Sequence, residues 1–96
     1  MTKRTPAQQG KHDQGVAKVV RYYEDLGYKV SADISGLPKP IIIHGRRPDV
    51  LAKKGKETVI VEVETKETLK TDVDQQKVFK RYADDHNSTR FRIKVV

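Results

Sequence analysis

The sequence feature that most constrains the fold is a pair of apolar segments separated by a basic turn. The segments are residues 47–53 and 57–65, and Gly55 lies in the turn between them. A glycine permits the tight reversal that a β-hairpin needs. Residues 59–61 (Val-Ile-Val) are apolar on both faces, which is typical of a strand covered on both sides. We therefore expect a β-hairpin in the middle of a sheet.

Three acidic residues lie on this hairpin. Asp49 follows a proline in the first segment, and Glu62 and Glu64 lie in the second. Side chains alternate between the faces of a strand, so the two glutamates project from one side, and hairpin pairing brings Asp49 close to them. Converging carboxylates destabilise the middle of a sheet unless positive charge compensates them, and hard divalent cations bind carboxylate oxygens. The pattern therefore predicts a site for Mg²⁺ or Mn²⁺ formed by these residues.

The rest of the chain predicts two helices and two further strands. Apolar residues at helical spacing indicate helices over 12–27 and 71–86. Alternating apolar and polar residues predict strands over 28–34 and 91–96. The chain is therefore expected to be α/β, in the order αβββαβ.

Two segments lack a clear periodic pattern. Residues 1–10 are polar and basic, and we expect a flexible segment that precedes one domain of residues 11–96. Residues 35–45 form a loop by their glycines and prolines, yet this loop contains Ile41-Ile42-Ile43. We expect these isoleucines to pack on the edge of the sheet or to pair briefly as a strand, with a dimer contact as the weaker alternative.

Charge and composition restrict the partners and the class of protein. Lys and Arg number 20 against 13 Asp and Glu, so the net charge of +7 suits a polyanionic partner. The alternative is that the lysines only keep a small domain in solution. The absence of cysteine excludes a disulfide framework and a thiolate zinc site. No apolar segment has membrane-spanning length and no apolar signal core opens the chain, so we expect a cytoplasmic protein without a membrane partner.

The order of elements, the Pro48-Asp49 step and the strand Glu62-Val63-Glu64-Thr65 resemble the PD-(D/E)XK nuclease superfamily. The resemblance covers about residues 11–96. Within that superfamily, this part of the chain is similar to the small Holliday-junction resolvases. It implies a restriction-endonuclease-like core, a central mixed sheet of about four strands flanked by two helices. It also implies Mg²⁺-dependent hydrolysis of phosphodiester bonds in duplex or branched DNA. Asp49 and Glu62 match the metal-binding carboxylates, and the Val63 carbonyl matches a further ligand.

The main departure from the superfamily is Glu64, which stands where most members have a catalytic lysine. That lysine is assigned to orienting or deprotonating the attacking water and to countering negative charge. A glutamate accepts a proton or holds a second metal, but it offers no positive charge. Lys66 or Lys70 can supply that charge, and a solvated lysine is the alternative for each. The resemblance thus assigns catalytic roles to Asp49, Glu62, Glu64 and Lys66.

A second departure lies in the first helix. Resolvase-like members have a glutamate there that helps to bind the metal, whereas this chain has Gly15 and Val16 at the equivalent depth. His12 or Asp13 can supply that function. The alternative for a histidine near a helix start is a surface or capping residue.

Other polar side chains are candidates for contacts with DNA. Cations that straddle phosphates position a nucleic acid without reading its sequence. Gln75 and Gln76 open the second helix, where superfamily members often place a polar residue facing the site; packing or solvent exposure is the alternative. Tyr22 and Tyr23 lie on or beside an apolar helical stripe, so we expect them in the core or half-buried rather than as base-stacking platforms. The candidate DNA contacts are Arg46, Arg47, Lys53, Lys54, Lys56 and Gln76.

Three functions are compatible with these features. The first is a metal-dependent nuclease that acts on DNA, with a homodimer needed to cut both strands because the chain is too small to encircle a duplex. The second is a catalytically inactive PD-(D/E)XK module that binds nucleic acid or a partner protein, which the missing lysine favours. The third is purely structural: the two glutamates pair with basic side chains on an exposed face of the sheet, namely those of Arg46, Arg47 or Lys66.

Overall fold

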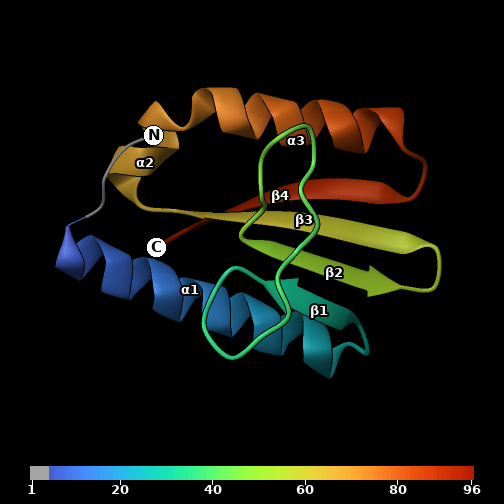
Figure 1. The fold of residues 1–96 in the computed structure, drawn as a ribbon, viewed down its shortest axis with the longest axis horizontal. Helices are drawn as coiled ribbons and strands as arrows, with labels where there is room; N and C mark the ends of the chain where they lie inside the picture. Colours follow the sequence, from blue (N-terminus) through green and yellow to red (C-terminus); the bar gives the residue numbers. More distant parts are fainter. Residues whose placement is uncertain (1–4) are drawn as a thin grey trace.

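The computed structural model describes residues 5–96 as an α/β fold. Four strands form one mixed sheet, and helices lie on both of its faces (Figure 1). In chain order the elements are α1 (Pro6–Asp25), β1 (Lys29–Ala32), β2 (Val50–Lys54), β3 (Glu57–Glu64), α2 (Lys66–Thr71), α3 (Val73–Asp85) and β4 (Thr89–Val95). The strand order is β1-β2-β3-β4; β2 is antiparallel to both of its neighbours, and β4 is parallel to β3.

β2 and β3 form the predicted hairpin, with Gly55 in the turn at a φ of 60°. β3 lies between β2 and β4, and its last six residues are buried, as expected for a central strand. β2 begins at Val50, three residues later than expected, so Asp49 lies just before the strand. Because Val50 is opposite Val61, Asp49 lies beside Glu62.

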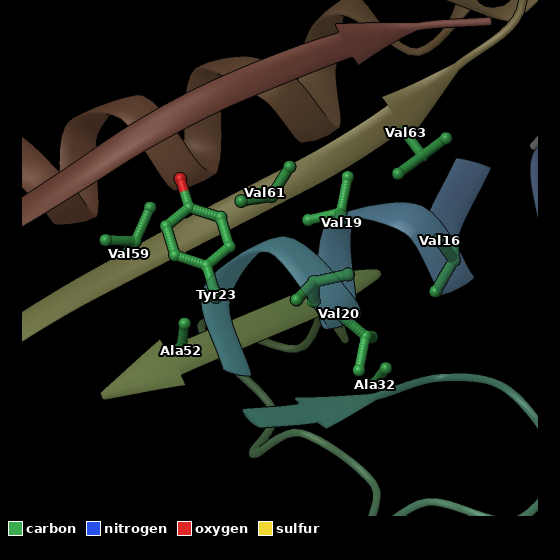
Figure 2. Packing of buried hydrophobic residues seen from close by; sticks show 10 residues of the cluster. Val16, Val19, Val20, Tyr23, Ala32, Ala52, Val59, Val61 and Val63 are labelled. Atoms are coloured by element: carbon green, nitrogen blue, oxygen red, sulfur yellow. The ribbon is translucent and has the colours of Figure 1, made fainter. Parts of the chain in front are cut away.

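The two faces of the sheet bury different residues because strand side chains alternate. The buried valines of β3 pack against α1 (Figure 2). Ile60 faces the other way and joins a second apolar cluster with Phe79 of α3. Glu62 and Glu64 share this second face with Ile60, so the predicted separation of the glutamates from the valines is confirmed.

α1 begins at Pro6, six residues earlier than expected. Thr5 caps it: the Thr5 Oγ1 accepts a hydrogen bond from the Gln8 N–H, and the Gln8 side chain accepts one from the Thr5 N–H. Pro6 has the fixed φ that suits the first position of a helix. The prediction of a flexible segment over residues 1–10 is therefore wrong for residues 6–10, while residues 1–4 lie outside the described part of the chain.

A short helix that the sequence pattern did not indicate, α2, separates β3 from α3. Thr65 caps α2, because the Thr65 Oγ1 accepts a hydrogen bond from the Thr68 N–H and the Thr68 Oγ1 accepts one from the Thr65 N–H. α3 consequently begins at Val73 rather than at residue 71. Within residues 5–96 the sheet is therefore flanked by three helices instead of the expected two.

The apolar part of the loop between β1 and β2 is divided between core and solvent. Ile43 is buried, packs in the cluster on the α3 face and forms a single β-bridge with Arg46. Ile41 and Ile42 are 55% and 59% exposed. The expectation of packing is therefore correct for Ile43 and wrong for its two neighbours.

α1 approaches the sheet closely at Gly15. A Cβ atom there would lie 2.8 Å from Cγ1 of Val63 and 2.6 Å from Cγ1 of Val96, which is closer than carbon atoms pack. The missing side chain therefore allows the first half of α1 to lie against the end of β3. His12, about one helical turn before Gly15, is thereby placed beside Asp49.

We predict that Gly15→Ala lowers the free energy of unfolding. Alanine is favoured over glycine in a helix by about 1 kcal/mol. The added methyl group, however, overpacks against the fully buried Val63, which costs about 1–3 kcal/mol. Urea unfolding followed by circular dichroism measures the change.

Gly10→Ala is the matched control for this prediction. Gly10 lies on the same helix, and a Cβ atom there meets no atom within 4 Å, so this substitution is expected to raise the stability. A gain in Gly15→Ala as large as the gain in Gly10→Ala would contradict the close packing of α1 on the sheet.

Candidate metal centre

Asp49 is held against the end of β3 by two hydrogen bonds. The Asp49 N–H donates to Glu62 Oε2 at 2.8 Å, and the Val63 N–H donates to Asp49 Oδ2 at 2.8 Å. Just before β2 begins, the Asp49 side chain thus takes the place of a backbone carbonyl as the acceptor for the Val63 N–H. The N–H and C=O of one strand residue point to the same side, so the Val63 carbonyl also points toward β2 and Asp49.

The two glutamates of β3 are buried under the start of α3. Glu62 is 0% exposed and Glu64 is 1% exposed. The Gln75 amide donates a hydrogen bond to Glu62 Oε1, and the Gln76 amide donates to Glu64 Oε2 at 3.4 Å and to the Leu69 carbonyl at 3.2 Å. Both glutamines therefore face the site. Both were expected as possible site-facing residues, with packing or solvent exposure as the alternative, and the structure places Gln75 on Glu62 and Gln76 on Glu64.

The three carboxylates meet as the sequence pattern predicts. One oxygen each of Asp49, Glu62 and Glu64 lie within 4.8 Å of one another. Oxygens on opposite sides of Mg²⁺, at about 2.1 Å from the ion, are about 4.2 Å apart, so small side-chain movements suffice to hold such an ion. The buried acidic triad can therefore hold a metal ion.

Burial raises the pKa of Glu62 to about 9, and the negative charge of Asp49 adds to this rise. Hydrogen bonds from the Asp49 N–H and the Gln75 amide oppose it, while the charge of Glu64 raises the pKa further. In the absence of a cation, Glu62 is therefore protonated at neutral pH. A divalent cation would stabilise the ionised carboxylate, so binding of an ion here would release this proton.

His12 of α1 reaches the same centre from the other side of the sheet. Its side chain is buried, with Nε2 3.2 Å from Asp49 Oδ1 and Nδ1 3.2 Å from Asp13 Oδ1. The surface or capping alternative for His12 is therefore wrong. Asp13 is exposed and lies on the far side of the imidazole ring, so its described contact with the centre runs through His12.

The basic residues of the hairpin turn lie far from the carboxylates. At about 3.3 Å per residue, Lys53 is about 13 Å along the strand from Asp49. Lys54 and Lys56 lie further still, and the Lys54 ammonium donates a hydrogen bond to the Leu26 carbonyl at the end of α1. These lysines therefore lie at the opposite end of the hairpin from the carboxylates, and their contact with DNA stays a prediction.

The two arginines and Lys66 also have positions that the sequence does not reveal. Arg47 is half-buried and donates a hydrogen bond from Nη1 to the Pro40 carbonyl at 2.9 Å. Arg46 is half-buried and bridges to Ile43 through its backbone. Lys66 does not continue the face of β3, because the strand stops at Glu64 and Lys66 is the exposed first residue of α2.

The burial of Glu62 and Glu64 contradicts the purely structural account of these residues. That account requires an exposed face on which Glu62 and Glu64 pair with basic side chains. The start of α3 covers this face, and both side chains are buried. Their partners include amide groups from α3 rather than a row of solvated cations.

Neither protein-family models, nor curated proteins, nor solved structures give a match. The helices within residues 5–96 are too short or too polar to cross a bilayer. The geometry of the acidic centre is therefore the basis for any functional assignment.

Glu62→Gln is expected to flatten the pH dependence of stability in the metal-free protein. The folded-state pKa of about 9 lies above the model value of 4.5. The stability that the neutral carboxyl contributes is thus fully present below about pH 4.5 and is lost as the pH rises through about 9.

Melting temperatures in EDTA between pH 5 and pH 9 measure this effect. For a domain of this size, each 1 kcal/mol lost lowers Tm by roughly 4–8 °C. The Tm of the wild type should fall more steeply with pH than that of Glu62→Gln. Equal slopes would show that Glu62 is ionised in the folded protein across this range.

Proposed function

We propose that this protein is a Mg²⁺- or Mn²⁺-dependent nuclease that hydrolyses phosphodiester bonds in DNA. The observation that supports this most strongly is the buried triad of Asp49, Glu62 and Glu64, with oxygens within 4.8 Å of one another. Buried carboxylates without a compensating cation cost free energy, so a domain keeps three together where they bind an ion. The proposal includes a restriction-endonuclease-like core, which the element order and the parallel pairing of β3 with β4 support.

The hydrolytic chemistry is divided between the ion and the protein. A bound divalent cation supplies positive charge that activates a water nucleophile and offsets charge developing on the scissile phosphate. Asp49 and Glu62 hold the ion, and the Val63 carbonyl faces the same side as Asp49. Glu64, at the position of the superfamily lysine, accepts the proton of the attacking water. Lys66 supplies positive charge to the phosphate only if its exposed side chain turns toward the centre.

Side chains behind the carboxylates fix their orientation. The Gln75 and Gln76 amides donate to Glu62 and Glu64, and His12 lies within ion-pair distance of Asp49. Such outer partners determine how well a carboxylate is presented to a metal. Asp49 is the most open member of the triad, with its side chain 15% exposed, so the substrate reaches the centre from its side.

DNA is the proposed substrate because the chain is strongly basic outside this centre. The net charge of +7 supports binding to a polyanion. A chain of this size does not encircle a duplex, so we propose that cleavage of both strands requires a homodimer.

A catalytically inactive module with the same fold is the second candidate. Glu64 replaces the lysine, and the candidate substitute Lys66 is exposed on α2 rather than aligned along β3. In this case the protein binds nucleic acid or a partner protein, and an ion at the triad only stabilises the fold.

Metal titration and cleavage assays distinguish the two candidates. Calorimetric titration with Mn²⁺ is expected to show binding to the wild type and none to Asp49→Asn or Glu62→Gln. Incubation of the wild type with duplex and branched DNA in Mg²⁺ should give cleavage that EDTA stops. Both variants should be slower by at least about 100-fold, because the ion supplies several kcal/mol of charge stabilisation.

Asp33→Asn is the matched control for these assays. Asp33 is exposed and paired with Lys39, so its loss should leave metal binding and cleavage unchanged. Metal binding without cleavage of any DNA would support the inactive module. The absence of metal binding by the wild type would contradict the metal centre itself.

His12→Ala is expected to weaken Mn²⁺ binding about 10- to 100-fold while leaving the fold intact. Loss of a residue that orients a metal-binding carboxylate has effects of this size. The same titration measures the change, with circular dichroism as the check on folding. His86→Ala is the control, because His86 is exposed and stacks on Tyr82. Equal affinities of His12→Ala and the wild type would show that His12 does not position Asp49.

A further inference from the structure

A groove lies on the face of the sheet opposite to the buried carboxylates. It has a volume of about 550 Å³ and runs between the second half of α1 and the outer strand β4. Val59, Val61 and Tyr23 line it from the sheet and from α1 (Figure 2). The acidic triad and the groove are therefore separate features of the fold.

Basic side chains from β4 and α1 also line the groove. Arg90, Arg92 and Lys94 alternate along β4 and are paired in register with the valines of β3, so all three side chains project toward the α1 face. Lys18 of α1 lines the groove as well. Of the described residues that line it, none is acidic, although Arg90 also pairs with Glu57 outside the groove at 3.4 Å. This surface is complementary to a polyanion.

An exposed aromatic ring lies in the same groove. Tyr22 is 60% exposed, so the expectation that it is in the core or half-buried is wrong, whereas Tyr23 is buried as expected. The two rings meet edge to face, with centroids 5.0 Å apart, so the Tyr22 ring packs against its buried neighbour. Leu26, immediately after the last residue of α1, is 46% exposed and extends this apolar surface.

We propose that this groove binds a single-stranded segment of nucleic acid. Cations that follow the backbone, combined with an exposed ring on which a base stacks, are the features of single-strand binding surfaces. In a duplex the bases are already stacked on one another and do not offer their faces to Tyr22. A second copy of the chain fits less well, because the same surface of both copies is cationic.

If the protein is the nuclease proposed above, the groove also indicates the class of DNA that it cuts. The groove ends at Lys94, whose partner in the sheet is Val63, the residue between Glu62 and Glu64. The groove thus runs along β3 at Val59 and Val61, and its Lys94 end reaches the level of Glu62 and Glu64 on the opposite face of the sheet. The substrate class is therefore DNA with a single-stranded segment next to the bond that is cut, such as a flap or a branch.

Fluorescence anisotropy with a labelled twelve-nucleotide dT oligomer tests the groove. The protein is Asp49→Asn in EDTA, so that neither metal nor cleavage contributes. Tyr22→Ala in this background should bind about tenfold more weakly, and Tyr22→Phe should retain the affinity, because only the ring is needed for stacking. Arg92→Gln should reduce the magnitude of the slope of log K against log salt concentration by about 0.7.

Lys77→Gln is the matched control, because it removes one exposed charge on α3, on the other face of the sheet from the groove. Its salt slope should equal that of the parent protein. Equal binding of Tyr22→Ala and Tyr22→Phe, equal salt slopes for Arg92→Gln and Lys77→Gln, or equal affinity for a duplex of the same length would overturn the inference. Failure of the wild type to cleave DNA in Mg²⁺ bears only on the proposed chemistry, because this assay contains no metal.

Discussion

The hydrogen-bonded pairing of Asp49 with the end of β3 is the interaction on which the rest of the centre depends. The Asp49 N–H donates to the Glu62 carboxylate and the Val63 N–H donates to the Asp49 carboxylate. The Asp49 side chain thereby extends the hydrogen bonding between β2 and β3 beyond Val50 and Val61, the last pair at this end of the two strands. Two carboxyl groups are held side by side by this pairing, and the burial of Glu62 beside Asp49 raises the pKa of Glu62.

Two helices on opposite faces of the sheet stabilise this arrangement. α1 brings His12 to Asp49, and it lies close enough to do so because Gly15 has no side chain. α3 brings Gln75 to Glu62 from the other face. The acidic centre is thus enclosed by side chains from both layers of the protein, and the basic groove remains on the face beside α1. The two glutamates and the cations of β4 therefore project from opposite faces of the sheet.

Much of the fold is predictable because its signals are local. The alternation along β3 and the glycine of the turn specify the hairpin and the faces of its side chains. The helix starts are less clear. Thr5 and Gln8 have capping-box spacing, but residues 6–10 lack the apolar periodicity of a helix. α2 is harder still, because Thr68 stands where such a box usually has Glu or Gln.

The sequence by itself determined that the three carboxylates converge, since strand alternation and hairpin pairing act between residues that are neighbours in the chain or across one turn. Only the tertiary structure decided which side chains surround them. His12 and Gln75 reach the carboxylates because helices distant in sequence pack on the sheet, whereas Lys53, near Asp49 in sequence, lies at the other end of β2. Helix packing depends on contacts along the whole chain, and no local pattern encodes it.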